Sequence, residues 1–123
     1  MVTLAEVMTR RILTVSPSTS VAEAATIMGE RAAGSALVME ERVLVGIFTE
    51  RDIVRALGRH FDAAAHPVAE WMTKDPVTAS PETPVQEALQ TMLERGFRHL
   101  PVLDEGEVVG VVSLRDLSRA TSA

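Results

Sequence analysis

Hydrophobic residues along this chain follow two different periods, and the two periods alternate twice. Val21, Ala24 and Met28 recur at intervals of three and four, which predicts a helix with one buried face over Val21–Arg31. The nearly continuous apolar runs "SALVM" and "VLVGIF" follow, and such runs are typical of strands that are buried on both faces. The same succession returns later, with a helical period over Val85–Arg95 and the runs "HLPVL" and "VVGVV".

Short acidic turns predict that each pair of apolar runs forms a hairpin. The turns at 40–42 and 104–106 are too short for a crossover, so the flanking strands should be antiparallel. A shorter apolar segment precedes each helix, and we expect first strands over Leu13–Val15 and Val77–Ala79. Each half of the chain therefore reads as β-α-β-β-α, and the fold class is α/β in the broad sense, more narrowly α+β.

Capping residues set the expected ends of the first helix of each half. Thr19 and Thr83 follow Ser-Pro and lie shortly before a glutamate, so we expect them to cap these helices at the N-terminus. Gly34 and Gly96 fall near the other end, where glycine is the preferred C-terminal residue.

An internal repeat explains why the pattern occurs twice. Met8–Ala56 aligns without a gap on Met72–Ala120, at a constant offset of 72 − 8 = 64. About 20 of roughly 49 positions are identical, far more than unrelated sequences show. We divide the chain into a first repeat over 1–61, a connector over 62–70 and a second repeat over 71–123. Because a unit of this size buries little surface alone, the two should pack as one pseudo-symmetric domain.

Both repeats end in a hydroxyl and a carboxylate three residues apart. Thr49 and Asp52 follow the last strand of the first repeat, and Ser113 and Asp116 follow that of the second. We expect the closing helices to begin at Thr49 and Ser113, where backbone N–H groups and the positive end of the helix dipole gather. The hydroxyl can then cap the helix or donate to a phosphate, and the carboxylate can accept the two hydroxyls of a ribose.

Two interpretations of this motif stay open on the residues alone. A Ser/Thr residue followed by an acid three positions later is also an ordinary capping box, worth about 1 kcal/mol to the helix. Arg51 and Arg115, each beside the acid, favour a ligand because guanidinium groups suit phosphate. Duplication does not separate the two interpretations, since it copies structural caps and binding sites equally well.

Three motifs recur or stand out along the chain: the "MT" that opens each repeat, the "RHLPV" stretch at Arg98–Val102, and G-x-x-[ST]-x-x-D at both strand-to-helix junctions. Together they resemble a tandem pair of CBS domains (cystathionine-β-synthase-type), also called a Bateman module. The resemblance covers nearly the whole chain. It implies a pseudo-twofold pair of β-α-β-β-α units with two clefts between them for adenosine-containing ligands. It also implies flat dimers and regulation of another protein.

The same resemblance implies two sites, each joining a junction of one repeat to strand starts of the other. The first joins Ser113, Arg115 and Asp116 to Ile12, Leu13, Thr14, Gly34, Ser35 and Ala36. The second joins Thr49, Arg51 and Asp52 to Pro76, Val77, Thr78, Arg98, His99, Leu100 and Pro101. Only the second brings Arg98 and His99 near the expected phosphate, so we expect it to prefer a phosphorylated ligand and the first to bind more weakly, bind without tight phosphate contacts or stay empty.

Composition narrows the function further. The net charge is −5 and aromatic residues make up 3%, which disfavours nucleic acid as the partner. The chain has no cysteine and none of the common catalytic motifs, so we expect neither an enzyme nor a catalytic cofactor or metal site. No apolar run is long enough to insert in a membrane, and we expect a cytoplasmic protein.

These observations lead to one main functional hypothesis and one rival. The main hypothesis is a stand-alone regulatory module that binds AMP, ADP, ATP or another adenosyl compound, such as S-adenosylmethionine or NADH. It would form a homodimer and signal to an unidentified partner protein through a conformational change. The rival is a structural dimerisation module whose clefts no longer bind a ligand.

Overall fold

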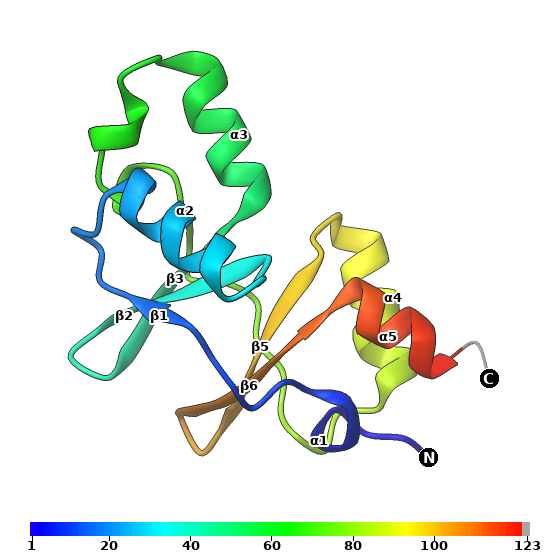
Figure 1. Cartoon of the computed structure of the whole chain (residues 1–123). Helices are drawn as coiled ribbons and strands as arrows, with labels where there is room; N and C mark the ends of the chain where they lie inside the picture. Colours follow the sequence, from blue (N-terminus) through cyan, green and yellow to red (C-terminus); the bar gives the residue numbers. More distant parts are fainter. Residues whose placement is uncertain (122–123) are drawn as a thin grey trace. The chain divides into compact units, whose positions relative to one another are not determined.

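A computed structural model describes residues 1–121 as an α+β protein with two compact units (Figure 1). The first-repeat unit comprises Leu13–Pro76. The second-repeat unit comprises Met1–Ile12 together with the described residues from Val77 onward. The mixed fold class predicted from the sequence is confirmed.

The first-repeat unit is built around a four-stranded sheet in the order β1-β2-β3-β4. β1 runs parallel to β2, and the other neighbours are antiparallel. Two helices and two short 3-10 turns complete the unit. Its elements are β1 (Thr14–Val15), α2 (Val21–Glu30), β2 (Ser35–Glu40), β3 (Val43–Thr49), α3 (Glu50–Arg59), η1 (Ala63–Ala65), η2 (Val68–Glu70) and β4 (Thr73–Lys74).

The second-repeat unit has the same hairpin and helices but shorter flanking pairings. Its antiparallel hairpin β5-β6 is extended by single bridges from Thr9 to Val111 and from Ala79 to Val102. The strand expected at Val77–Ala79 is thus reduced to one parallel bridge. The elements of this unit are α1 (Leu4–Val7), α4 (Val85–Arg95), β5 (His99–Asp104), β6 (Glu107–Ser113) and α5 (Leu114–Thr121).

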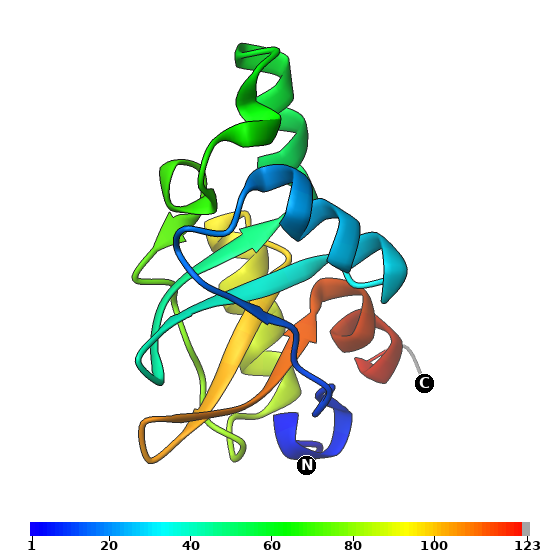
Figure 2. The ribbon, with the colours of Figure 1, turned by 60° about the vertical axis from the view of Figure 1, so that its left-hand side comes forward.

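Each unit has its own hydrophobic core, formed by the predicted helix face against the hairpin. In the first-repeat unit, Val21, Ala24 and Met28 of α2 pack with Phe48 of β3 and Ala56 of α3. Figure 2 shows α2 lying along the β2-β3 hairpin. The other core consists of Leu4, Val85, Ala88, Met92, Leu100, Val102, Val112 and Leu117.

The helix caps differ from the prediction in detail. Ser20, not Thr19, is the N-cap of α2, and its hydroxyl accepts the Glu23 N–H at 3.0 Å. Pro84, not Thr83, is the N-cap of α4. The two threonines instead close the preceding turns. The hydroxyl of Thr19 accepts the Ser16 N–H, as that of Thr83 accepts the Ser80 N–H, each at 3.1 Å.

The C-terminal glycine was correctly predicted in only one repeat. Gly96 caps α4 in the left-handed conformation, with φ of 77°, which glycine adopts without strain. α2 ends at Glu30 with Arg31 as its cap, so Gly34 lies beyond the helix, and Ala32 takes the positive φ instead.

The compact units do not coincide with the sequence repeats, because each repeat contributes its first segment to the other unit. Thr73 pairs with Ile47 of β3, and Thr9 pairs in the same way with Val111 of β6. The Thr9 N–H donates to the Val111 carbonyl at 2.9 Å and the return bond measures 3.0 Å. Subtracting 64 from 73 gives 9, and adding 64 to 47 gives 111, so the exchange is reciprocal.

A close approach between glycine and methionine fixes both exchanged segments. A Cβ atom on Gly46 would lie 2.5 Å from the Met72 sulfur, and one on Gly110 would lie 2.7 Å from the Met8 sulfur. The carbonyls of Thr73 and Thr9 would each be 3.0 Å away. Only glycine lets the "MT" segment come this near the third strand, which explains both the glycine and the methionine of the repeat.

We predict that Gly46→Ala destabilises the protein by about 1–3 kcal/mol, because the added methyl overlaps the Met72 side chain and the Thr73 carbonyl. Gly58→Ala is the matched control, since nothing lies within 4 Å of its Cβ position and alanine favours the helix. Chemical denaturation followed by circular dichroism measures both. A Gly46→Ala protein as stable as the control would show that the close approach is not needed.

Candidate functional site

The junction between β3 and α3 places Thr49 and Asp52 together. Thr49 is the N-cap of α3, and Asp52 occupies the third helical position. The Asp52 oxygen Oδ2 accepts the Thr49 backbone N–H at 2.9 Å and the Thr49 hydroxyl at 3.2 Å. Asp52 is only 6% exposed. Because it occupies the third helical position, its carboxylate lies at the first turn, where the helix dipole favours negative charge.

Arg55 binds the other oxygen of the same carboxylate. Its Nη2 lies 3.2 Å from Asp52 Oδ1 and donates to the Trp71 carbonyl at 2.6 Å. The guanidinium carbon also lies 5.6 Å from the centre of the Trp71 ring, within the range of a cation–π contact. Asp52 is therefore held from both sides, by the helix cap and by a cation fixed to another segment.

The corresponding junction between β6 and α5 is bonded differently. The Ser113 hydroxyl accepts the Asp116 backbone N–H at 3.1 Å, as an N-cap does. Within the described residues, the Asp116 carboxylate has no hydrogen-bond or ion-pair partner, and this residue is half-buried. The Asp116 carboxylate therefore has more hydrogen-bond acceptor positions open than the Asp52 carboxylate has.

In the first-repeat unit, three predicted segments meet at one end of the sheet. Ser35 pairs with Thr49 across β2 and β3, and the Glu50 N–H donates to the Gly34 carbonyl at 3.2 Å. The Leu13 carbonyl accepts the Leu37 N–H at 2.8 Å. Ser35, Ala36 and Asp52 are buried here, and the unit also contains Thr14, Arg51 and Pro76.

The second-repeat unit repeats this arrangement. His99 pairs with Ser113, and the Leu114 N–H donates to the Arg98 carbonyl at 2.8 Å. The Pro101 carbonyl accepts the Ala79 N–H at 3.0 Å. This unit also contains Ile12, Val77, Thr78, Leu100, Arg115 and Asp116.

Each unit thus brings together a junction, a second-strand start and a first strand of its own. The two predicted sites combine segments from different units, and these combinations stay predictions. Arg51 and Arg115 have exposed side chains on the first turns of α3 and α5.

Among the described residues, no group of three or more side chains could hold a metal ion. The described helices include none long and apolar enough to cross a membrane.

Sequence reasoning missed Arg55 and Trp71 as neighbours of the site. The available signal was the Arg-Ala pair that closes both repeats, Arg55–Ala56 and Arg119–Ala120. Arg55 lies one helical turn after Asp52, so an ion pair between them was accessible from spacing alone. The contact with Trp71 joins positions 16 apart and needed the folded chain.

The family model of the CBS domain matches residues 4–59 and again 68–123, and the chain therefore belongs to the CBS domain family as a tandem pair. A curated relative, an uncharacterised 17.7 kDa protein of Acidianus ambivalens, is 42% identical over 120 residues. That alignment spans 95% of this chain and 71% of the relative.

Solved structures are similar over almost the whole chain. The CBS-domain-containing protein ATU1752 of Agrobacterium tumefaciens superposes with a TM-score of 0.91 at 30% identity, covering 97% of this chain and 98% of that one. The CBS domain pair of MJ0100, solved with 5′-methylthioadenosine and S-adenosyl-L-methionine, has a TM-score of 0.88 at 28% identity, covering 97% and 94%. CBSX2 in complex with AMP has a TM-score of 0.82 at 28% identity, covering 96% and 94%.

We predict that Asp52→Asn lowers the free energy of unfolding by about 1–2 kcal/mol, because it weakens the bonds from Thr49 and Arg55. Asp116→Asn, at the matching position, should change it by less than about 0.5 kcal/mol, since its carboxylate has no such partners within the described residues. Urea denaturation at neutral pH compares the two. Equal destabilisation would contradict the difference between the junctions.

Proposed function

We propose that this protein is a regulatory module that binds an adenosine-containing ligand at its two Ser/Thr-x-x-Asp junctions. The carrying observation is a carboxylate at the third position of a helix that follows a strand directly, beside a hydroxyl, in both repeats. The complexes of MJ0100 and CBSX2 with adenosyl compounds support the same ligand class.

The chemistry of a nucleoside phosphate suits these groups. A carboxylate has about four acceptor positions, and a ribose diol needs one on each oxygen. At Asp52, Oδ2 is used by the Thr49 N–H and hydroxyl, and Oδ1 by Arg55. If the Thr49 hydroxyl turns to a phosphate, one position opens on Oδ2 while one is already open on Oδ1. The diol and the phosphate can then be bound together, with the diol sharing Oδ1 with Arg55.

The finer assignments belong to the same proposal. AMP, ADP, ATP, S-adenosylmethionine and NADH are the candidate ligands, and the junction at Asp52, with Arg98 and His99, is the one that prefers a phosphate. The ligand is regulatory, with no catalytic step or cofactor. Binding favours one of two conformations by its different affinity for them, and a partner protein in the cytoplasm responds.

We expect AMP or ATP to raise the stability of the protein, by about 2.7 kcal/mol at 100 times the dissociation constant. Calorimetric titration of wild type, Asp52→Asn and Asp116→Asn then separates the sites. Asp52→Asn should remove the tighter phase, which the proposal assigns to the junction that prefers a phosphate. Circular dichroism of each variant controls for folding.

Two results would count against this proposal in different ways. Equal loss of affinity in the two variants would contradict the asymmetry of the sites but not nucleotide binding. No thermal shift with AMP, ADP, ATP, S-adenosylmethionine or NADH would favour the rival hypothesis, a structural module with vestigial sites.

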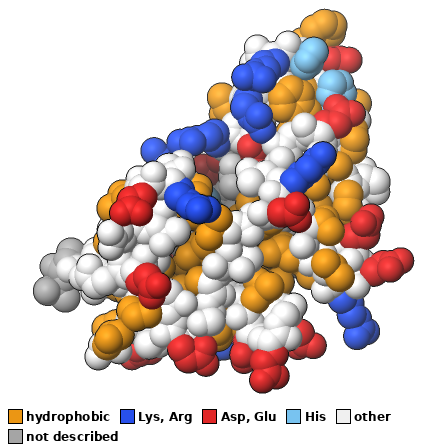
Figure 3. Space-filling model, turned by 180° about the vertical axis from the view of Figure 1, so that it is seen from behind, with side chains coloured by type: hydrophobic (Ala, Val, Ile, Leu, Met, Phe, Trp, Pro, Cys, Tyr) orange, Lys and Arg blue, Asp and Glu red, His pale blue; other side chains and the backbone are white. Residues whose placement is uncertain are grey.

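A homodimer is the second element of the proposal. The exposed fractions of Val54, Leu57 and Phe61, on and just after α3, are 72%, 47% and 96%. In Figure 3, hydrophobic side chains lie beside histidine side chains at the upper end of the view. Adding 64 to 54 and 57 gives Ser118 and Thr121, so the second repeat is polar at the matching positions. An apolar face confined to one copy of a duplicated helix supports its use against a second molecule.

We predict that Leu57→Glu shifts the protein from dimer to monomer in multi-angle light scattering, because a charge would have to be desolvated in the interface. Ser118→Glu, on the polar counterpart, should leave the dimer intact. A Leu57→Glu protein that remains dimeric would exclude this face as the interface.

A further inference from the structure

The connection from Asp52 to Trp71 goes beyond what ligand binding itself requires. Arg55 Nη2 contacts Asp52 Oδ1 at 3.2 Å and the Trp71 carbonyl at 2.6 Å, so one nitrogen joins the two. The Arg55 side chain is 42% exposed, whereas that of Asp52 is 9% exposed. The partly exposed guanidinium is thus held through one nitrogen by a buried carboxylate and a backbone carbonyl.

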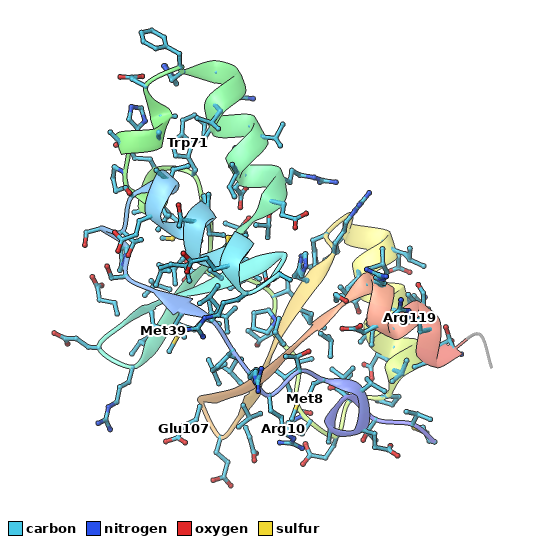
Figure 4. The ribbon with its side chains drawn as sticks, viewed as in Figure 1. Met8, Arg10, Met39, Trp71, Glu107 and Arg119 are labelled. Atoms are coloured by element: carbon cyan, nitrogen blue, oxygen red, sulfur yellow. The ribbon has the colours of Figure 1, made fainter. Side chains whose placement is uncertain are left out.

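Trp71, labelled in Figure 4, also contacts a group of side chains from the connector region, which consists of His60, His66 and Glu70. Its ring stacks on His66, with centroids 6.2 Å apart and an interplanar angle of 18°, and meets the edge of His60 at 5.9 Å. His66 lies 3.1 Å from a Glu70 carboxylate oxygen. The Trp71 backbone leads directly into Met72, which packs on Gly46. A shift at Trp71 would therefore reach both the connector and the exchanged segment of this unit.

The indole at the end of this link has no counterpart in the other repeat. Position 71 corresponds to position 71 − 64 = 7, where the chain has Val7. Duplication therefore does not account for the indole. Its Nε1 is buried without a hydrogen-bond partner among the described residues, which makes the ring an environment-sensitive group next to the cation.

We propose that Arg55 is a positioning residue: it orients Asp52 to accept a ribose diol and transmits a change in that carboxylate to Trp71. The inference rests on the proposed function for its ligand. When a diol donates to Oδ1, it shares that oxygen with Arg55 and weakens the pull of Asp52 on the guanidinium. Arg55 is then held mainly by the Trp71 carbonyl, which it already contacts at 2.6 Å, and its altered orientation over the Trp71 ring changes the surroundings of the indole.

The test uses Trp71 as the reporter, because it is the only tryptophan in the chain. AMP should change its emission in the wild-type protein. Arg55→Lys keeps the charge but loses the planar guanidinium, so we expect about tenfold weaker AMP binding by calorimetry and no emission change. Arg119→Lys, at the matching position of the second repeat, is the control and should retain both.

A ligand-free comparison separates this inference from the proposed function. Asp52→Asn and Arg55→Lys should each shift the Trp71 emission, and the double variant should shift it no further than one of them. An emission spectrum that Asp52→Asn leaves unchanged would overturn the link, whether or not AMP binds. If the wild-type protein binds no AMP, the proposed function is wrong, and so is the claim that Arg55 affects AMP affinity. The ligand-free comparison then still tests whether Asp52 is connected to Trp71 through Arg55. Unchanged AMP affinity in Arg55→Lys would overturn the positioning role.

Discussion

The close approach of a methionine to a glycine is the contact on which the organisation of this protein depends. Met72 on Gly46 and Met8 on Gly110 bring the start of each repeat against the third strand of the other. The distances leave no room for a side chain at either glycine, so the pairing selects one residue type at each position. Each compact unit is completed by a segment that belongs, in sequence, to its counterpart.

This exchange places the candidate site next to a segment that comes from far along the chain. Trp71 immediately precedes Met72, and its carbonyl accepts the hydrogen bond from Arg55. Arg55 in turn binds Asp52, the carboxylate of the strand-to-helix junction. The polar contacts of Asp52 at the start of α3 are therefore connected, through Trp71, to the packing of Met72 on Gly46. In the second-repeat unit, Asp116 has no comparable partners within the described residues, so duplication preserved the motif but not its surroundings.

Local pattern predicted the elements well and their exact ends less well. The helices over Val85–Arg95 and near Val21 were correct, because their apolar faces recur with a helical period. The caps were displaced by one residue to Ser20 and Pro84, since several neighbouring residues can satisfy the same free N–H groups. Gly34 was expected to cap its helix as Gly96 does, but subtracting 64 from 96 gives Ala32, and it is Ala32 that takes the positive φ in the first repeat.

The sequence by itself determined the duplication, the order of elements, the family and the position of the Thr49–Asp52 motif at the start of a helix. All of these follow from residues close together in the chain or related by one constant offset. Only the tertiary structure decided which segments complete each unit. It also decided which of the two junction carboxylates is hydrogen-bonded to neighbouring protein groups. Those outcomes depend on contacts between distant positions, such as Arg55 with Trp71 and Met72 with Gly46, whose side chains must fit in space before they can interact.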